Sequence, residues 1–305
     1  MGARPTFATM TPDPARERRI GYLCAFAVLF VWVGFLLSSR LSAQQAFTPW
    51  DVAALRYLGG CLGALPLALW LGWPKLPPLR LVAIVGTAAL GFPILAYHGF
   101  AFAPAAHAGV MNAGMLPFLT AALGAIFLGE AWTRQRVLSL GVVACGVALL
   151  MLDTFGAHPG AWRGDLLFLA GASSWAVYTV LIRRWGVSAV QATLSAALWA
   201  APIYLPVWWL FLPSNLGAVP MGAIAWQLVY QGIFAVLVAG FLFTRAVTAI
   251  GAPRTTTITA LVPAMAALAA WPLLGEPLGV AGLAGVALVS AGMVVGVVGL
   301  RPRGR

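Results

Sequence analysis

The side chains that could do chemistry in this sequence are polar or ionisable groups set inside long apolar stretches. Arg56 lies about seven residues into the stretch 49–71, and ionisable groups at such positions are functional candidates by default. Its guanidinium could attract a carboxylate substrate, join a gating pair, or bond carbonyls of a neighbouring segment. Tyr97 and His98 lie deep in 79–101, where the imidazole either carries a proton or is a neutral ring bonded to a neighbour.

Amides and aromatic rings form a second group of candidates. Asn112 needs hydrogen-bond partners, which a cavity or a neighbouring helix could provide. Gln227 and Gln231 are four residues apart, so they share one face of a helix, and we expect this face to turn to a cavity. Aromatic rings either clamp an organic substrate or pack the core. The expected substrate-binding residues are Trp32, Arg56, Tyr97, His98, Asn112, Trp175, Tyr178, Gln227 and Gln231.

No catalytic signature accompanies these residues. The sequence has no P-loop lysine motif, no His-Glu-x-x-His, and no Gly-x-Ser-Gly. The three cysteines, Cys24, Cys61 and Cys145, lie in separate apolar runs and match no metal motif. We therefore expect no catalytic residue, no metal and no cofactor, and a protein that is not an enzyme.

The elements that carry these residues must lie in a membrane. Of the 305 residues, 62% are hydrophobic and 8% are charged, whereas soluble proteins carry roughly 25% charged residues. The net charge of +11 does not indicate a nucleic-acid partner, because Lys75 is the single lysine and the arginines form no stripe. The lipid bilayer is the expected partner.

Ten apolar runs have the length that a membrane-spanning helix needs, about 20 residues. Backbone groups in lipid must bond within the segment, which favours helices, and the runs lack the alternation of barrel strands. The expected spans are 20–39, 49–71, 79–101, 105–128, 135–152, 164–182, 189–211, 222–245, 253–274 and 277–299.

The basic residues orient these spans. If the N-terminus is inside, only two basic residues, Arg40 and Arg163, lie outside, and Arg56 lies within a span. Both termini are therefore expected on the cytoplasmic side of the cell (inner or plasma) membrane. The basic residues expected on the cytoplasmic side are Arg4, Arg16, Arg18, Arg19, Lys75, Arg80, Arg134, Arg136, Arg183, Arg184, Arg245, Arg254, Arg301, Arg303 and Arg305.

The chain also repeats itself. Pro117 precedes Glu130 by 13 residues, as Pro263 precedes Glu276, and both glutamates follow Leu-Gly. Five spans per copy is an odd number, so the second copy must enter the membrane from the opposite side, as in many secondary transporters. The openings match as well: Gly21, Trp32 and Arg40 correspond to Gly164, Trp175 and Arg183.

These motifs resemble the drug/metabolite transporter superfamily, in its EamA-type ten-span branch. The resemblance implies an all-α fold, a 5+5 inverted repeat around a central cavity, and alternating access. It covers repeats at 20–152 and 164–299, between a disordered tail at 1–19 and a basic tail at 300–305. The expected function is the transport of small organic metabolites such as amino acids, with export as the expected direction. The transporter is expected to be a monomer or a homodimer. A non-transporting sensor or scaffold and an integral membrane enzyme are the alternatives.

Overall fold

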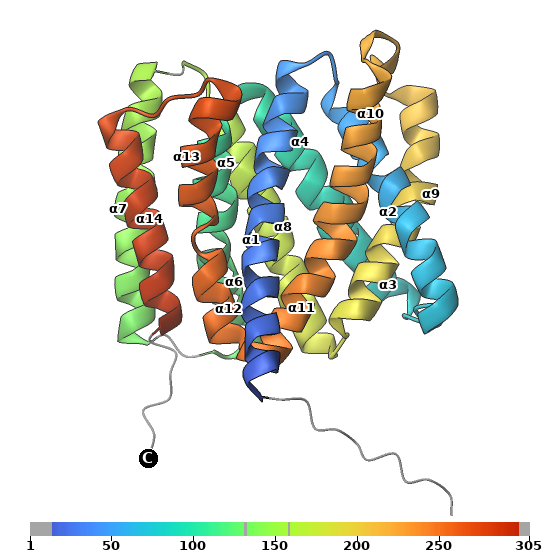
Figure 1. The fold of residues 1–305 in the computed structure, drawn as a ribbon, viewed down its shortest axis with the longest axis horizontal. Coiled ribbons are helices and arrows are strands. Elements are labelled where there is room, and N and C mark those ends of the chain that lie inside the picture. The colour runs from blue at the N-terminus through green and yellow to red at the C-terminus, as the bar shows by residue number, and fades with distance from the viewer. Residues whose placement is uncertain (1–13, 131–132, 158, 299–305) are drawn as a thin grey trace, which may run out of the picture.

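The computed structural model describes residues 14–130, 133–157 and 159–298, and within them the chain forms ten helical membrane crossings (Figure 1). The first five are α1 (Pro14–Gln44), α2 (Pro49–Leu71), α3–η1–α4 (Pro78–Ile84, Val85–Gly91, Phe92–Phe102), α5–η2–α6 (Ala105–Ala108, Gly109–Gly114, Leu116–Leu128) and α7 (Arg134–Ala157). The second five are α8 (Trp162–Trp185), α9 (Ala189–Phe211), α10–η4–α11 (Met221–Gln227, Leu228–Val238, Ala239–Ile250), α12–α13 (Ala252–Thr259, Val262–Leu274) and α14 (Val280–Val298). A short 3-10 turn, η3 (Leu216–Ala218), precedes α10, whereas η1, η2 and η4 are π-helical.

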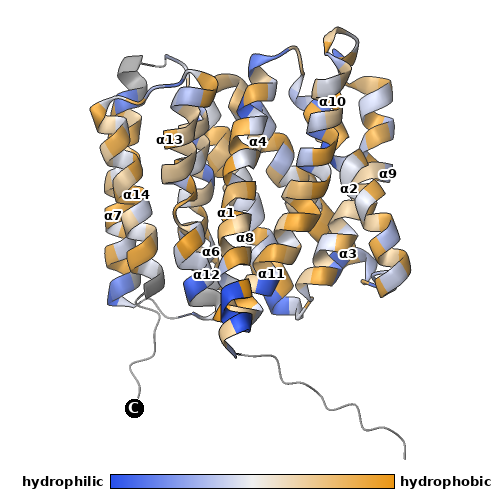
Figure 2. Cartoon of the chain, in the orientation of Figure 1, coloured by the Kyte–Doolittle hydropathy of each residue, from blue (hydrophilic) through white to orange (hydrophobic). Residues whose placement is uncertain are grey.

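The predicted ten-helix membrane fold is confirmed. Eight crossings are long and apolar enough to span a bilayer, and two shorter apolar helices, Val137–Asp153 and Val280–Gly296, complete the set within the described ranges. α1 begins and α14 ends at the same side of the molecule, here called the N-terminal face (Figure 1). Hydrophilic residues gather at the two ends of the helices, and apolar residues dominate between them (Figure 2).

The first helix is longer than the apolar run that predicted it. α1 begins at Pro14, so residues 14–19, which were expected in the tail, are helical. One polar side chain of this segment joins it to the second copy: the Glu17 carboxylate accepts a hydrogen bond from Arg245 at 2.6 Å. The remainder of that expected tail, and the basic tail at 300–305, lie outside the described residues.

Two crossings break in the same way at their prolines. The crossing that contains η2 turns at Met115, just before Pro117, and the α12–α13 crossing turns at Ala260 and Leu261, just before Pro263. A proline has no amide hydrogen to donate and its ring clashes with the preceding turn, so a helix bends there. Both copies are therefore bent at the equivalent proline.

The last crossing packs on the fifth through small residues. A Cβ added to Gly285 would lie 2.6 Å from the Gly146 carbonyl oxygen, and one added to Gly292 would lie 2.6 Å from Val143. Close approach through glycine is a common way for membrane helices to pack. These contacts join α14 to α7 within one chain, and the two helices form a pair at one edge of the molecule (Figure 1).

Candidate functional site

A buried polar cluster lies where the two copies meet. The Arg56 guanidinium donates from Nη1 to the main-chain carbonyl of Gln231 at 3.2 Å, and the Tyr97 hydroxyl donates to Oε1 of the same glutamine at 3.1 Å. Nε2 of Gln231 donates in turn to Ser39 Oγ at 3.0 Å. Arg56 is 8% exposed and Gln231 is fully buried. The cluster thus joins α1, α2 and α4 of the first copy to η4 of the second.

The local backbone explains how Gln231 reaches this position. It lies in a π-helical segment, and such segments occur frequently at functional sites. Next to it, Gly232 packs directly on Gly59 of α2, where a Cβ on Gly232 would lie 2.6 Å from the Gly59 Cα. Because neither residue has a side chain, the two helices approach closely enough for Arg56 to reach the η4 backbone.

Aromatic rings surround the guanidinium. The Arg56 Cζ lies 5.5 Å from the centre of the Phe35 ring, within the range of a cation–π interaction. Phe35 also contacts Tyr97, with ring centres 6.3 Å apart. Tyr57, the residue after Arg56, packs edge-on against Tyr204 at 4.8 Å and donates its hydroxyl to the Ala89 carbonyl at 2.7 Å. The cluster therefore combines one cation with several aromatic side chains packed around it.

Gln227 lies on the same face as Gln231 but one turn nearer the opposite face of the membrane. Its amide donates to the Ser38 carbonyl at 3.0 Å and accepts from the Ser38 hydroxyl at 3.2 Å. The indole of Trp226 also donates to Ser38 Oγ, at 3.0 Å. Gln227 is thus bonded to α1 and stabilises the seam between the copies beside the cluster.

Arg56 has no acidic partner in the part of the chain that the structure describes. Each described carboxylate bonds elsewhere, and Asp51 in particular belongs to the capping box at the start of α2, where it accepts hydrogen bonds from Thr48, Trp208 and Asn215. The remaining pairs are Glu17–Arg245, Glu130–Arg183, Asp153–Gly279, Asp165–His107 and Glu276–Arg40. The cluster consequently holds one uncompensated positive charge.

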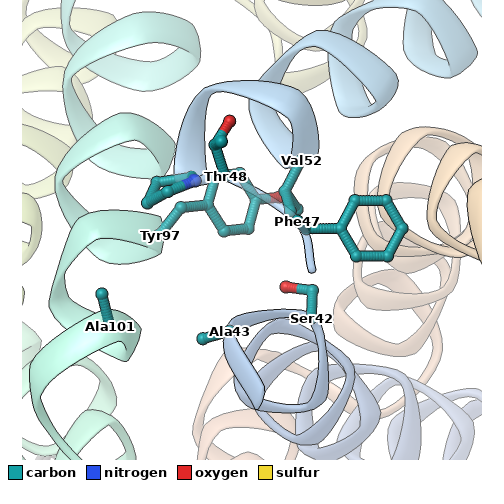
Figure 3. Close-up of a pocket in the computed structure, with 8 residues that line it drawn as sticks. Ser42, Ala43, Phe47, Thr48, Val52, Tyr97 and Ala101 are labelled. Atoms are coloured by element: carbon teal, nitrogen blue, oxygen red, sulfur yellow. The ribbon is translucent and has the colours of Figure 1, made fainter. Parts of the chain in front are cut away.

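A small pocket of about 40 Å³ opens above the cluster, between α1, α4 and the start of α2. Tyr97 points into it from α4, and Ser42 and Thr48 border it from the other side (Figure 3). A space of this size holds a few water molecules but not an amino acid. A substrate would therefore need a movement of the helices to enter.

The predicted site residues His98 and Asn112 lie outside the cluster. The His98 ring bonds the Ile94 carbonyl one turn earlier, with Nδ1 at 2.7 Å, and packs edge-on against Trp50 at 4.2 Å. Asn112 is 6% exposed in the π-helical segment η2, and its side chain makes no hydrogen bond to any described residue. The structure therefore brings Arg56 and Tyr97 together with the glutamines, and leaves His98 and Asn112 apart.

The predicted aromatic residues are related by the repeat rather than gathered in one place. Trp32 of α1 packs against Phe243 of α11 at 5.5 Å, and Trp175 of α8 packs against Phe92 of α4 at 5.1 Å. In both cases a tryptophan from one copy meets a phenylalanine from the other. Tyr178 contacts Trp175 at 5.0 Å and is buried on the N-terminal side of the fold.

Sequence reasoning missed a buried hydrogen bond between a histidine and an aspartate. Nδ1 of His107 donates to Oδ1 of Asp165 at 2.9 Å, and the two side chains are 0% and 3% exposed. The pair joins α5 to α8, the first helix of the second copy. The only signal in the sequence is that each residue lies at the start of an apolar run, which does not show that the two starts are adjacent.

Sequence reasoning also missed how the repeated glutamates are paired. The four-residue spacing would allow Glu130 to pair with Arg134, but in the structure the Glu130 carboxylate bonds Arg183 of the other copy. Glu276 bonds Arg40, again across the copies, at 2.5 Å. The matching positions of these four residues in the repeat were visible in the sequence, and they hinted at exchanged partners.

Two similar halves of five membrane crossings, with a polar cluster between them, define the class of inverted-repeat membrane transporters. The EamA-like transporter family matches residues 19–152 and again residues 162–298, and the chain belongs to this family. The predicted relation to the drug/metabolite transporter superfamily is confirmed. The family and the named relatives are transporters.

Several relatives match almost the whole chain. A probable amino-acid metabolite efflux pump of Salmonella typhimurium is 27% identical over 94% of this chain and 97% of its own. A protein of the same name from Escherichia coli is 27% identical over the same shares. A probable terminal-alkyne amino-acid exporter of Streptantibioticus cattleyicolor is 26% identical over 71% of this chain and 75% of its own. A solved crystal structure, 24% identical, aligns over 90% of this chain and 95% of its own with a TM-score of 0.64, which supports the fold.

Proposed function

We propose that this protein is a secondary transporter that exports small metabolites bearing a carboxylate, such as amino acids, by alternating access. The observation that carries the proposal is Arg56, a buried cation between the two copies with no carboxylate beside it among the described residues. An isolated charge inside a membrane protein is costly. A substrate carboxylate would compensate that charge through short, charge-assisted hydrogen bonds.

The guanidinium has the donors that this role needs. An arginine carries five N–H groups in a rigid fork, and in the structure Arg56 donates a hydrogen bond to the Gln231 carbonyl. Tyr97 and Gln231 add a hydroxyl and an amide within the same cluster. An arginine that only ties two helices together is the competing role, and the single carbonyl bond by itself fits that role as well.

The relatives support the substrate class and the direction. Two of them are named as probable amino-acid metabolite efflux pumps and a third as a probable amino-acid exporter. For this chain we place the N-terminal face in the cytoplasm, because the basic residues of the loops gather there. The protein would then lie in the cell membrane and take its substrate from the cytoplasm.

The test uses purified protein in liposomes and a panel matched in size: an amino acid, its amide, and the amine left after removal of the carboxylate. We expect flux of the amino acid alone, and loss of that flux in Arg56→Gln. Arg163→Gln is the matched control, since Arg163 stacks on Trp162 at the membrane surface, away from the cluster. Equal flux of all three compounds, or full activity of Arg56→Gln, would contradict the proposal.

Arg56→Gln could fail for a structural reason, and a second measurement separates that case. The parent protein should gain thermal stability when the amino acid is added and gain none with the amine, because a ligand that binds the folded state stabilises it. A parent that responds equally to both compounds would show that the carboxylate is not recognised.

A further inference from the structure

Two arginine–glutamate pairs join the copies, and the repeat relates one pair to the other. Arg40, near the end of α1, pairs with Glu276, which follows α13. Arg183, in the last turn of α8, pairs with Glu130, which follows α6. Each pair takes its arginine from one copy and its glutamate from the other. Because the copies are inverted, α6 and α8 end at the N-terminal face, whereas α1 and α13 end at the opposite face (Figure 1). The two pairs at these helix ends therefore lie at opposite faces.

The backbone presents both glutamates in the same way. Gly129 and Gly275 have φ values of +69° and +68°, the left-handed conformation that glycine adopts at the end of a helix. The amide of Glu130 then donates to the Gly124 carbonyl at 3.3 Å, and that of Glu276 donates to the Ala270 carbonyl at 3.4 Å. The repeated Leu-Gly-Glu motif is therefore a helix terminus that holds a carboxylate at the seam between the copies.

The pair at the opposite face is the more buried of the two and has additional hydrogen-bond partners. Arg40 donates from Nε to Glu276 at 2.5 Å and from Nη1 to the Phe100 carbonyl at 2.5 Å. The Glu276 carboxylate also accepts hydrogen bonds from the main-chain amide of Ala105 at 3.0 Å and from the side-chain amide of Gln44 at 3.3 Å. The side chains of Arg40 and Glu276 are 19% and 9% exposed. Four crossings are held together at this point.

The pair at the N-terminal face is more exposed, at 47% for Arg183 and 25% for Glu130. Exposed ion pairs contribute little to stability, whereas breaking a buried pair is strongly destabilising. The two faces are thus closed by equivalent contacts of unequal strength. This inequality favours a conformation in which the opposite face is shut.

We propose that these pairs are the latches of two gates, so that opening the substrate site to one face breaks one pair and keeps the other. The inference rests on the proposed transport function and adds the residues that decide which side the site opens to. In an inverted repeat, the state open to one face is the state open to the other with the roles of the copies exchanged. A contact that bridges the copies at one face must separate for that face to open.

The test measures access from outside, without any substrate. Ser42 borders the pocket above the cluster and is 2% exposed, so Ser42→Cys reports opening of that face. It would be placed in a background where the three native cysteines are serine, and labelled in intact cells with a membrane-impermeant maleimide. We expect Glu276→Gln to raise the labelling rate about fivefold or more, and Glu130→Gln to lower it.

Asp153→Asn is the matched control. Its carboxylate lies at the same face and bonds the Gly279 amide, but it belongs to neither latch, and labelling should stay at the parent rate. Arg40→Gln breaks the same latch as Glu276→Gln and should give the same increase if that variant does not fold. Exchanging the partners, as Arg40→Glu with Glu276→Arg, should return the rate toward that of the parent.

Equal labelling of the parent, Glu276→Gln and Glu130→Gln, or a change of the same sign in both variants, would overturn the latch proposal. This readout is separate from flux. Opposite shifts in the labelling rate, in a protein that transports no carboxylate compound, would support the latches and contradict the proposed substrate. Selective flux of the amino acid with no shift in the labelling rate would support the proposed substrate and contradict the latches.

Discussion

Gly232 of η4 packs on Gly59 of α2 so closely that a Cβ on Gly232 would lie 2.6 Å from the Gly59 Cα atom. The contact joins the second copy to the first and places Gln231 next to Arg56. A backbone contact of this kind allows no side chain on either partner without moving a helix. The geometry of the polar cluster therefore depends on two residues that have no side chain.

Gly232→Ala is expected to damage the fold and the cluster together. The added methyl group meets backbone atoms that cannot rotate away, and overpacking of this kind costs about 1–3 kcal/mol. Gly222→Ala is the control, because a Cβ there meets nothing within 4 Å. Thermal unfolding in detergent should show a clear loss for Gly232→Ala and none for Gly222→Ala. A neutral Gly232→Ala would mean that α2 and η4 are not held this closely.

Tyr97→Phe is expected to weaken substrate binding without unfolding the protein. It removes the hydroxyl that bonds Oε1 of Gln231 and borders the pocket (Figure 3). The loss of one hydrogen bond, about 1 kcal/mol, corresponds to a rise of about fivefold in KM. Tyr204→Phe is the control, since its hydroxyl bonds the Trp50 carbonyl outside the cluster. Equal effects of the two variants on KM would remove Tyr97 from the site.

Much of the fold follows from the sequence because a membrane imposes simple rules. The length of each apolar run predicted a crossing, and the spacing of Pro117 and Glu130 from their counterparts predicted two copies. Periodicity does not show where a run of polar residues just outside the membrane stays helical. The extension of α1 back to Pro14 depends on contacts such as that of Glu17 with Arg245, which join distant parts of the chain.

The site was predictable in part. Arg56 and Gln231 were predicted because a charge or an amide inside a membrane span is costly and therefore indicates a functional site. Which of the candidates meet depends on how the helices pack, and the spacing along one helix does not contain this information. Asp165 and His107 are far apart in sequence, and their contact follows from the arrangement of α5 against α8. Ser39 was missed because a serine in an apolar run is common.

His98→Gln is expected to leave the pH dependence of transport unchanged. The imidazole bonds the Ile94 carbonyl of its own helix and packs on Trp50, apart from the polar cluster. We expect a small loss of stability, about 1 kcal/mol, from the lost aromatic contact. Flux measured across a series of pH values in liposomes checks this. A flat profile in the variant, where the parent has a slope, would restore His98 as a proton carrier.

His107→Ala is expected to destabilise the protein strongly. It leaves the buried Asp165 side chain without its hydrogen-bond partner, and an unsatisfied buried polar group costs about 1–3 kcal/mol, or more where the group is charged. The double variant His107→Leu with Asp165→Leu removes both polar side chains and should be more stable than His107→Ala. Thermal unfolding of the three proteins tests the coupling. A double variant less stable than His107→Ala would contradict this expectation and show that the hydrogen bond stabilises the fold by more than the burial of its two polar groups costs.

The orientation of the chain can be tested at two loops that lie on opposite faces. Lys75 is exposed in the loop between α2 and α3, at the N-terminal face, and Ser214 is exposed in the loop between α9 and α10. With the native cysteines replaced, Ser214→Cys should react with an impermeant maleimide in intact cells, and Lys75→Cys only after the membrane is opened. This follows from the excess of arginine at the N-terminal face, because basic loops are retained in the cytoplasm. The reverse pattern would place the Arg183–Glu130 pair outside and would exchange the expected signs of the two latch variants.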